Sequence, residues 1–82
     1  MKILYFAKIS EDLGKSEDTL KIEKKLKVYQ IIEILKKKND KYALVFKNLS
    51  NVKFAINCEY VSKNHLISDE DELAIFPPVT GG

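Results

Sequence analysis

Arginine and tryptophan are absent from this chain of 82 residues, and cysteine and histidine each occur once. The fourteen basic residues are therefore all lysines. Because arginine is preferred for bidentate recognition of phosphates and bases, its absence argues against a nucleic-acid-binding protein. The single cysteine, Cys58, excludes a disulfide within the chain. It also favours a reducing compartment, so a cytoplasmic location is expected.

Metal sites and membrane segments are not expected either. One cysteine and one histidine are too few ligands for zinc, and Cys58 lacks the accompanying pattern of a cysteine nucleophile. His65 stands in a polar stretch, "SKNHL", and is expected at the surface. No segment approaches the roughly 20 apolar residues of a membrane helix. The opening "MKILYFAKIS" lacks the long apolar core and cleavage site of a signal peptide, so we expect it to be a strand.

The length predicts one domain with little room for an internal active site. A domain of this size buries only about 60% of the surface that its unfolded chain exposes. Apolar residues make up 45% of the chain and charged residues 32%, with a net charge of +2, which is typical of a globular domain. The sequence therefore favours a carrier or binding protein over an enzyme that acts alone.

Two short runs are almost continuously apolar and stand at opposite ends of the chain. Ile3–Ala7 and Leu73–Phe76 both have the composition of central strands covered on at least part of both faces. Thr19–Glu23 and Val52–Ile56 alternate between apolar and polar residues, which predicts half-buried strands. Shorter extended pieces are expected at Tyr60 and Val61 and at Leu66 and Ile67.

The middle of the chain changes to helical spacing. Val28, Ile31, Ile32 and Leu35 lie at i, i+3, i+4 and i+7, which predicts one helix, and Asn39 is expected to end it. The polar segment "SEDLGKSED" before the second strand is expected to be a loop that turns at Gly14, with at most one helical turn at residues 11–13. Residues 42–46, "YALVF", fit either a short helix or a strand.

These elements predict an α+β fold. The two most apolar strands, the first and the last, should lie side by side and parallel at the centre of a mixed sheet, with the helix packed across one face. This is the architecture of a β-grasp, ubiquitin-like domain. We expect the domain to span residues 1–76, followed by an extended tail, residues 77–82.

The tail, "FPPVTGG", is the most informative stretch. Pro77 cannot donate to a sheet ladder, so the last strand should end at Phe76. Residues 77–82 can then project by about 20 Å, at about 3.3 Å per residue. Gly81 and Gly82 have no Cβ and suit a narrow channel in a partner. The terminal carboxylate of Gly82 is the group left for chemistry, and it must be activated before a nucleophile can attack it.

The chain resembles the MoaD family, the small sulfur-carrier subunits of molybdopterin synthase. The resemblance rests on "ILYFAKISEDLG", on "AIN", on the acidic turn "SDEDE", and above all on "FPPVTGG". The turn lacks the glycine that the family often has there. The resemblance implies that a MoeB-like enzyme uses ATP to adenylate Gly82, that a sulfur donor protein then provides sulfur for a thiocarboxylate, and that no cofactor is bound permanently.

The resemblance also implies a catalytic partner. A large, MoaE-like subunit would supply the catalytic residues, take the tail into its active site and pass the sulfur to a cyclic pyranopterin precursor, in a heterotetramer of two small and two large subunits. On this interpretation the small subunit is not an enzyme by itself. A channel in the large subunit would hold the six tail residues, which are Pro77, Pro78, Val79, Thr80, Gly81 and Gly82.

A partner surface is expected on the sheet face opposite the helix. Alternation with period two places Lys2, Leu4, Phe6 and Lys8 on one face of the first strand, and Glu72, Ala74 and Phe76 on one face of the last. Exposed apolar patches often mark interfaces. The resemblance places the large subunit on Phe6 and Phe76, and on Tyr60. The acidic residues 69–72 are expected either to steer partners or to be a solvated turn.

Three other functions stay open at this point. A ThiS-like sulfur carrier for thiamine synthesis shares the fold and the two glycines but usually lacks the Phe-Pro-Pro lead-in. A ubiquitin-like protein modifier would differ only in its acceptor, a lysine of another protein. A β-grasp interaction module would not need a free carboxylate at Gly82.

Overall fold

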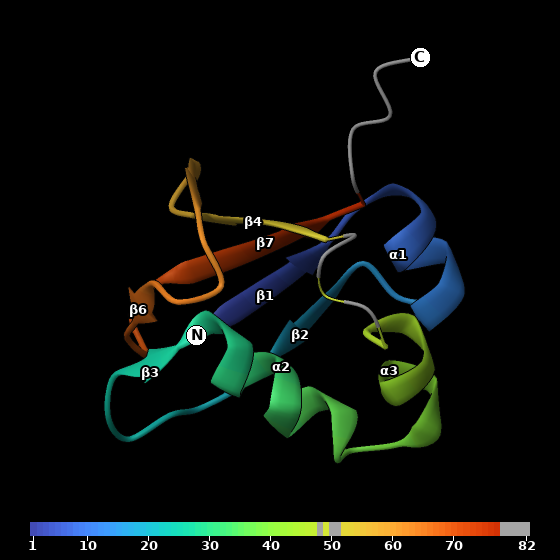
Figure 1. Cartoon of the computed structure of the whole chain (residues 1–82), viewed down its shortest axis with the longest axis horizontal. Helices are drawn as coiled ribbons and strands as arrows, with labels where there is room; N and C mark the ends of the chain where they lie inside the picture. The colour runs from blue at the N-terminus through green and yellow to red at the C-terminus, as the bar shows by residue number, and fades with distance from the viewer. Residues whose placement is uncertain (48, 50–51, 78–82) are drawn as a thin grey trace.

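The computed structural model describes residues 1–47, 49 and 52–77, and Figure 1 shows its arrangement. A mixed sheet of five strands, in the order β2-β1-β7-β4-β5, is covered by helices on one face. Two further strands, β3 and β6, form a separate antiparallel pair. The elements are, in chain order, β1 (Lys2–Tyr5), α1 (Ala7–Leu13), β2 (Glu17–Thr19), β3 (Leu26–Lys27), α2 (Val28–Lys36), α3 (Asp40–Val45), β4 (Lys53–Ile56), β5 (Glu59–Val61), β6 (Leu66–Ile67) and β7 (Glu72–Phe76).

The predicted β-grasp arrangement is confirmed. The first and last strands pair in parallel, with Ile3 opposite Leu73 and Tyr5 opposite Ile75. β7 is hydrogen-bonded on its other side to β4, in antiparallel orientation. Burial of the inward side chains explains why these two strands are the most apolar of the chain, since Ile3, Leu73 and Ile75 are fully buried.

The helix predicted from apolar spacing is α2. Val28, Ile31, Ile32 and Leu35 are all buried against the sheet. Its start has no side-chain cap from Lys27, but the Gln30 side-chain oxygen accepts a hydrogen bond from the Lys27 backbone N–H at 2.8 Å. This bond satisfies a backbone donor at the entrance to the helix.

Asn39 does not end α2 in a left-handed conformation, as the sequence had suggested. Its φ is −167°, and it is the N-cap of α3, where Oδ1 accepts from the backbone N–H groups of Lys41 at 2.8 Å and Tyr42 at 3.3 Å. This cap makes residues 40–45 helical, which decides the ambiguous "YALVF" segment in favour of a helix.

The first strand is shorter, and the following helix longer, than the sequence had suggested. β1 ends at Tyr5, and Ala7 turns the chain out of the sheet with a φ of +52°. Lys8 therefore lies in α1 and not on the strand. Ile9 and Leu13, spaced i and i+4, are buried, and Gly14 ends the helix with a φ of +74°. The i, i+4 spacing of Ile9 and Leu13 is typical of a helix, but the alternation that we extended along the first strand to Lys8 hid this pattern.

The second strand also differs from its prediction. β2 comprises Glu17–Thr19 and pairs with β1, whereas Thr19–Glu23 was expected. Leu20 and Ile22 do turn inward. The Leu20 backbone N–H donates to the Met1 carbonyl at 2.9 Å, which continues the register of β1 and β2 by one residue pair. The Ile22 backbone N–H donates instead to the Asp69 carboxylate at 2.9 Å, so beyond Leu20 the alternation reflects burial of side chains and not a continued ladder.

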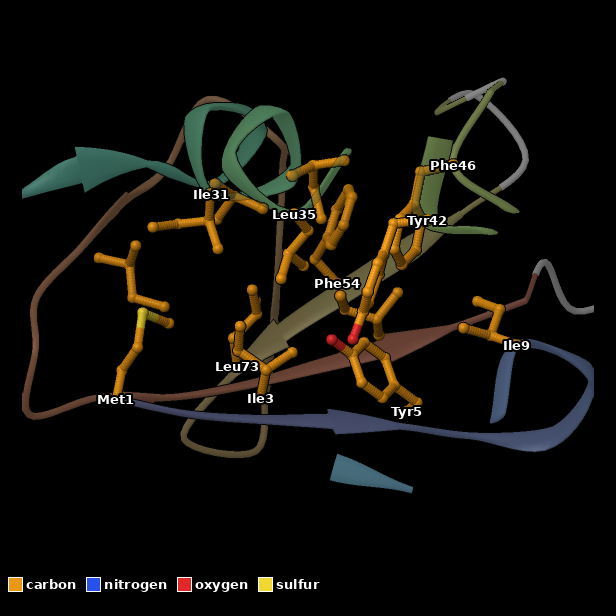
Figure 2. Close-up of a cluster of buried hydrophobic side chains, with 14 of the residues drawn as sticks. Met1, Ile3, Tyr5, Ile9, Ile31, Leu35, Tyr42, Phe46, Phe54 and Leu73 are labelled. Carbon is orange, nitrogen blue, oxygen red and sulfur yellow. The ribbon is translucent and has the colours of Figure 1, made fainter. Parts of the chain in front are cut away.

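A single hydrophobic core fills the space between the sheet and the helices (Figure 2). The hydroxyl groups of Tyr5 and Tyr42 lie close to each other within this cluster (Figure 2), and both donate to Oδ2 of Asp18, at 2.8 and 2.6 Å. Burial and this hydrogen bond hold the pKa of Tyr5 well above its usual value. One carboxylate from β2 therefore joins the sheet to α3.

Within the described ranges, no helix has the length and apolar character needed to cross a membrane.

Candidate functional site

Three aromatic rings meet where the central strands end. Phe6 follows β1, Phe76 is the last residue of β7, and Tyr60 lies on the edge strand β5. The rings of Phe6 and Phe76 are stacked, with centroids 4.7 Å apart and an interplanar angle of 10°. Tyr60 is tilted against Phe76, at 5.9 Å. Phe6 is 40% exposed and Tyr60 is 73% exposed, so these rings form a surface and not part of the core.

A row of smaller apolar side chains continues this surface across the sheet. The strand registers place Leu4 beside Ala74, Ala74 beside Ala55, and Ala55 beside Tyr60. The two alanines between larger neighbours leave a shallow depression of about 260 Å³. We call the surface formed by Leu4, Phe6, Ala55, Tyr60, Ala74 and Phe76 the apolar patch.

The structure thus brings together the five residues that the sequence had assigned to the partner surface. Ala55 was missed, although its place in the alternation of β4 puts it on the same face. The helices cover the other face of the sheet, so the patch is on the solvent side (Figure 1). Rings, aliphatic groups and one phenol suit binding to another apolar surface and not proton transfer.

The segment "PVTGG" that follows the patch lies outside the described residues, and its predicted roles stay predictions. Pro78, Val79, Thr80, Gly81 and Gly82 belong to it. Pro77 is the last described residue, and β7 ends just before it, as its missing N–H predicts. The apolar patch therefore lies directly at the base of the tail.

Two carboxylates of the acidic turn have structural partners. Asp69 Oδ1 accepts from the Ile22 backbone N–H at 2.9 Å and from the Met1 α-ammonium at 3.1 Å, and both lower its pKa, the backbone bond most. Asp71 accepts from the Ser68 backbone N–H at 2.9 Å, which lowers its pKa in the same way. These contacts hold the turn against the rest of the domain. Asp69 and Asp71 therefore have a structural role and are not simply solvated, as one of the two expectations for this turn had it. A steering role for the remaining charges stays a prediction.

Asn57 joins the acidic turn to the hairpin between β4 and β5. Its side-chain amide donates to Asp71 Oδ1 at 3.0 Å, and its side-chain oxygen accepts from the Glu72 backbone N–H at 3.1 Å. The next residue, Cys58, is exposed and lies at the rim of the depression in the apolar patch. His65 is exposed, as expected, on the loop before β6.

Among residues 1–47, 49 and 52–77, no cluster of three or more His, Cys, Asp or Glu side chains is arranged to hold a metal ion.

Comparison with known proteins gives a consistent result. The model of the ThiS family matches residues 3–82. The molybdopterin synthase sulfur carrier subunit of Dictyostelium discoideum is 36% identical over 99% of this chain and 94% of its own length.

Two solved structures share the fold over nearly the whole chain. A Pyrococcus furiosus protein assigned as molybdopterin converting factor subunit 1 has a TM-score of 0.74 and 30% identity, covering 95% of both chains. Small archaeal modifier protein 1 from Methanosarcina acetivorans has a TM-score of 0.75 and 27% identity, covering 99% of this chain and 94% of its own. The ubiquitin-like fold is therefore shared with a protein named as a molybdopterin converting factor subunit and with one named as a protein modifier.

Proposed function

Because the chain belongs to the ThiS family, we propose that it is the sulfur-carrier subunit of a molybdopterin synthase. The observation that carries this proposal is the match to a named sulfur carrier subunit over nearly the full length, together with a family match that extends through Gly81 and Gly82. The two glycines are thus part of the similarity and not an unrelated end.

The chemistry proposed for the tail needs two steps. A MoeB-like adenylating enzyme first joins the Gly82 carboxylate to AMP, using ATP and releasing pyrophosphate. Hydrosulfide provided by a sulfur donor protein then attacks the adenylated carbonyl carbon, AMP leaves, and Gly82 carries a thiocarboxylate. A bound cofactor is not needed for this role, and the single cysteine is consistent with work in the cytoplasm.

The sulfur is then delivered inside a large, MoaE-like subunit. That subunit holds the catalytic residues and the cyclic pyranopterin precursor, and the assembly contains two small and two large subunits. An extended chain of six residues, the length of segment 77–82, can span about 20 Å, and two glycines allow close approach of channel walls to the backbone. The apolar patch at the base of the tail is the docking surface for the large subunit.

Intact mass measurement tests the carrier chemistry. The protein is incubated with the adenylating enzyme, ATP and sulfide, and a product heavier by the difference between sulfur and oxygen is expected, localised to Gly82 by fragmentation. Cys58→Ala should load equally, since the sulfur is carried on the terminus. Sulfur found on Cys58, or full turnover by a chain lacking Gly82 or extended by one residue, would refute the proposal.

Binding to the large subunit tests the docking surface. Phe6→Asp places a charge beside the stacked ring of Phe76 and should abolish complex formation without unfolding the domain, because Phe6 is 40% exposed. Leu44→Asp is the matched control, since Leu44 is 73% exposed on α3, away from the patch, and this variant should bind normally. Normal binding by Phe6→Asp would show that the patch is not the docking surface.

A second candidate is a protein modifier, which the similarity to small archaeal modifier protein 1 favours. In that case Gly82 would be joined to lysines of other proteins. Cell extracts would then contain covalent adducts of this chain that disappear when Gly82 is deleted. Thiamine synthesis, the other role associated with the name of the family, is tested by whether loss of the chain makes growth dependent on thiamine.

A further inference from the structure

A groove runs beside the apolar patch at the base of the tail. It has a volume of about 810 Å³ and is lined mainly by apolar side chains, among them Phe6, Phe54, Phe76 and Pro77. Of the described residues that line it, Lys53 is the only charged one. A groove of this kind can receive an apolar side chain of a partner, but an ammonium group then becomes part of the contact surface.

The sheet register fixes Lys53 beside the groove. Lys53 is the first residue of β4 and pairs with Phe76, the last residue of β7. It is exposed, and alternation along β4 puts its side chain on the same face as Ala55. Lys53 therefore lies opposite Phe76, the residue that precedes the tail, and its side chain lines the groove.

Lys53 differs from the lysines that already have partners. Lys2, Lys8, Lys15 and Lys36 each lie within 4.0 Å of a carboxylate. In the part of the chain that the structure describes, no carboxylate lies within that distance of Lys53. Its charge is thus balanced by solvent when the groove is open.

Covering the groove would remove that solvent. A buried charge without a partner is strongly unfavourable, whereas one that meets an opposite charge with good geometry recovers much of the loss. A partner that offers only apolar side chains would therefore bind poorly here. A partner that offers an apolar side chain and a nearby carboxylate matches both features of the groove.

We propose that the large subunit inserts an apolar side chain into this groove and pairs an Asp or Glu carboxylate with Lys53. This inference rests on the proposed function, since it names a feature of that same partner. The ion pair contributes mainly to binding specificity. Large subunits that carry the carboxylate bind with higher affinity than those that place a cation or only apolar groups opposite Lys53.

Binding measurements with charge-matched variants test the proposal. The large subunit from the same organism is titrated with wild type, Lys53→Glu, Lys53→Met and Lys24→Glu. Lys53→Glu should weaken binding by about thirtyfold or more, because two carboxylates would then face each other. Lys53→Met should bind with intermediate affinity. Lys24→Glu, which changes the net charge equally at an exposed site on the loop before β3, should stay within about threefold.

A reversed pair supplies the positive test. Replacing the facing carboxylate of the large subunit with lysine should restore the affinity of Lys53→Glu and weaken that of wild type. Equal binding by Lys53→Glu and Lys24→Glu, with both variants folded by circular dichroism, would overturn the ion pair. If the wild-type protein forms no complex with the large subunit, both the proposed function and this inference are refuted. If the wild-type protein binds, Phe6→Asp does not bind and Lys53→Glu binds with wild-type affinity, only the proposed ion pair is refuted.

Discussion

Replacing Cys58 with glycine is expected to stabilise the protein. Asn57 and Cys58 connect β4 to β5, and their φ angles are +49° and +74°. Two positive φ angles are characteristic of a type I′ hairpin turn, in which asparagine is favoured first and glycine second. Asn57 fits its position, but Cys58 occupies the place where a Cβ is unfavourable.

The size of the effect follows from two opposing terms. A residue with a Cβ in the left-handed conformation costs about 1–2 kcal/mol. Glycine avoids this cost but loses more conformational entropy on folding, by about 0.5–1 kcal/mol. Because Cys58 is exposed, its side chain adds little burial. The free energy of unfolding should therefore rise by about 0.5–1 kcal/mol, which corresponds to an increase in Tm of about 2–8 °C for a domain of this size.

Thermal and urea unfolding, followed by circular dichroism, measure this change. Cys58→Ala is the matched control, because it removes the thiol but keeps the Cβ and should give no comparable gain. The turn cannot relax easily to another conformation, since Asn57 is held by Asp71 and by the Glu72 backbone. An unchanged Tm for Cys58→Gly, or an equal rise for Cys58→Ala, would show that the left-handed backbone is not the source of strain.

Two further predictions concern carboxylates. Asp69 and Asp71 have lowered pKa values in the fold. The stability that they contribute is therefore present above the unfolded pKa of about 3.9 and is lost as the pH falls through their lower folded values. The urea concentration at the unfolding midpoint should stay constant between pH 6 and 8 and should decrease when the pH is lowered below about 4. Asp18→Ala should lower the free energy of unfolding by about 2–3 kcal/mol, because two tyrosine hydroxyls lose their acceptor. The control Asp12→Ala removes only an exposed ion pair and should change the free energy of unfolding by less than about 0.5 kcal/mol. Equal effects of the two substitutions would refute the role of Asp18.

The centre of the fold could be predicted from sequence because both of its central strands carry apolar side chains on two faces. Ile3, Tyr5, Leu73 and Ile75 are buried in the core, whereas Leu4, Phe6, Ala74 and Phe76 form part of the apolar patch on the other face. The apolar spacing of α2 is equally direct, since all four predicted residues are buried. Four residues of the apolar patch, Leu4, Phe6, Ala74 and Phe76, followed from alternation once these strands were placed, whereas Tyr60 followed from the family resemblance.

The ends of elements could not be predicted, because they depend on single backbone conformations and distant contacts. Ala7 ends the first strand with a positive φ, although alanine gives no sign of such a turn. Asp18 is 13 residues from Tyr5 and 24 from Tyr42, so its role as their common acceptor appears only in three dimensions. The position of Lys53 beside Phe76 likewise depends on the exact register of β4 with β7.

The place of β7 in the sheet explains how a small domain can hold the start of its tail in a defined position. β7 is hydrogen-bonded to β1 on one side and to β4 on the other, so its last residue, Phe76, has a defined position. Phe76 belongs to the apolar patch, and the next residue begins the tail. A partner that docks on the patch thereby fixes the starting point of the tail as well. Since a misplacement of about 1 Å can cost about a hundredfold in rate, a binding surface that adjoins the tail serves the proposed sulfur transfer better than one elsewhere on the domain.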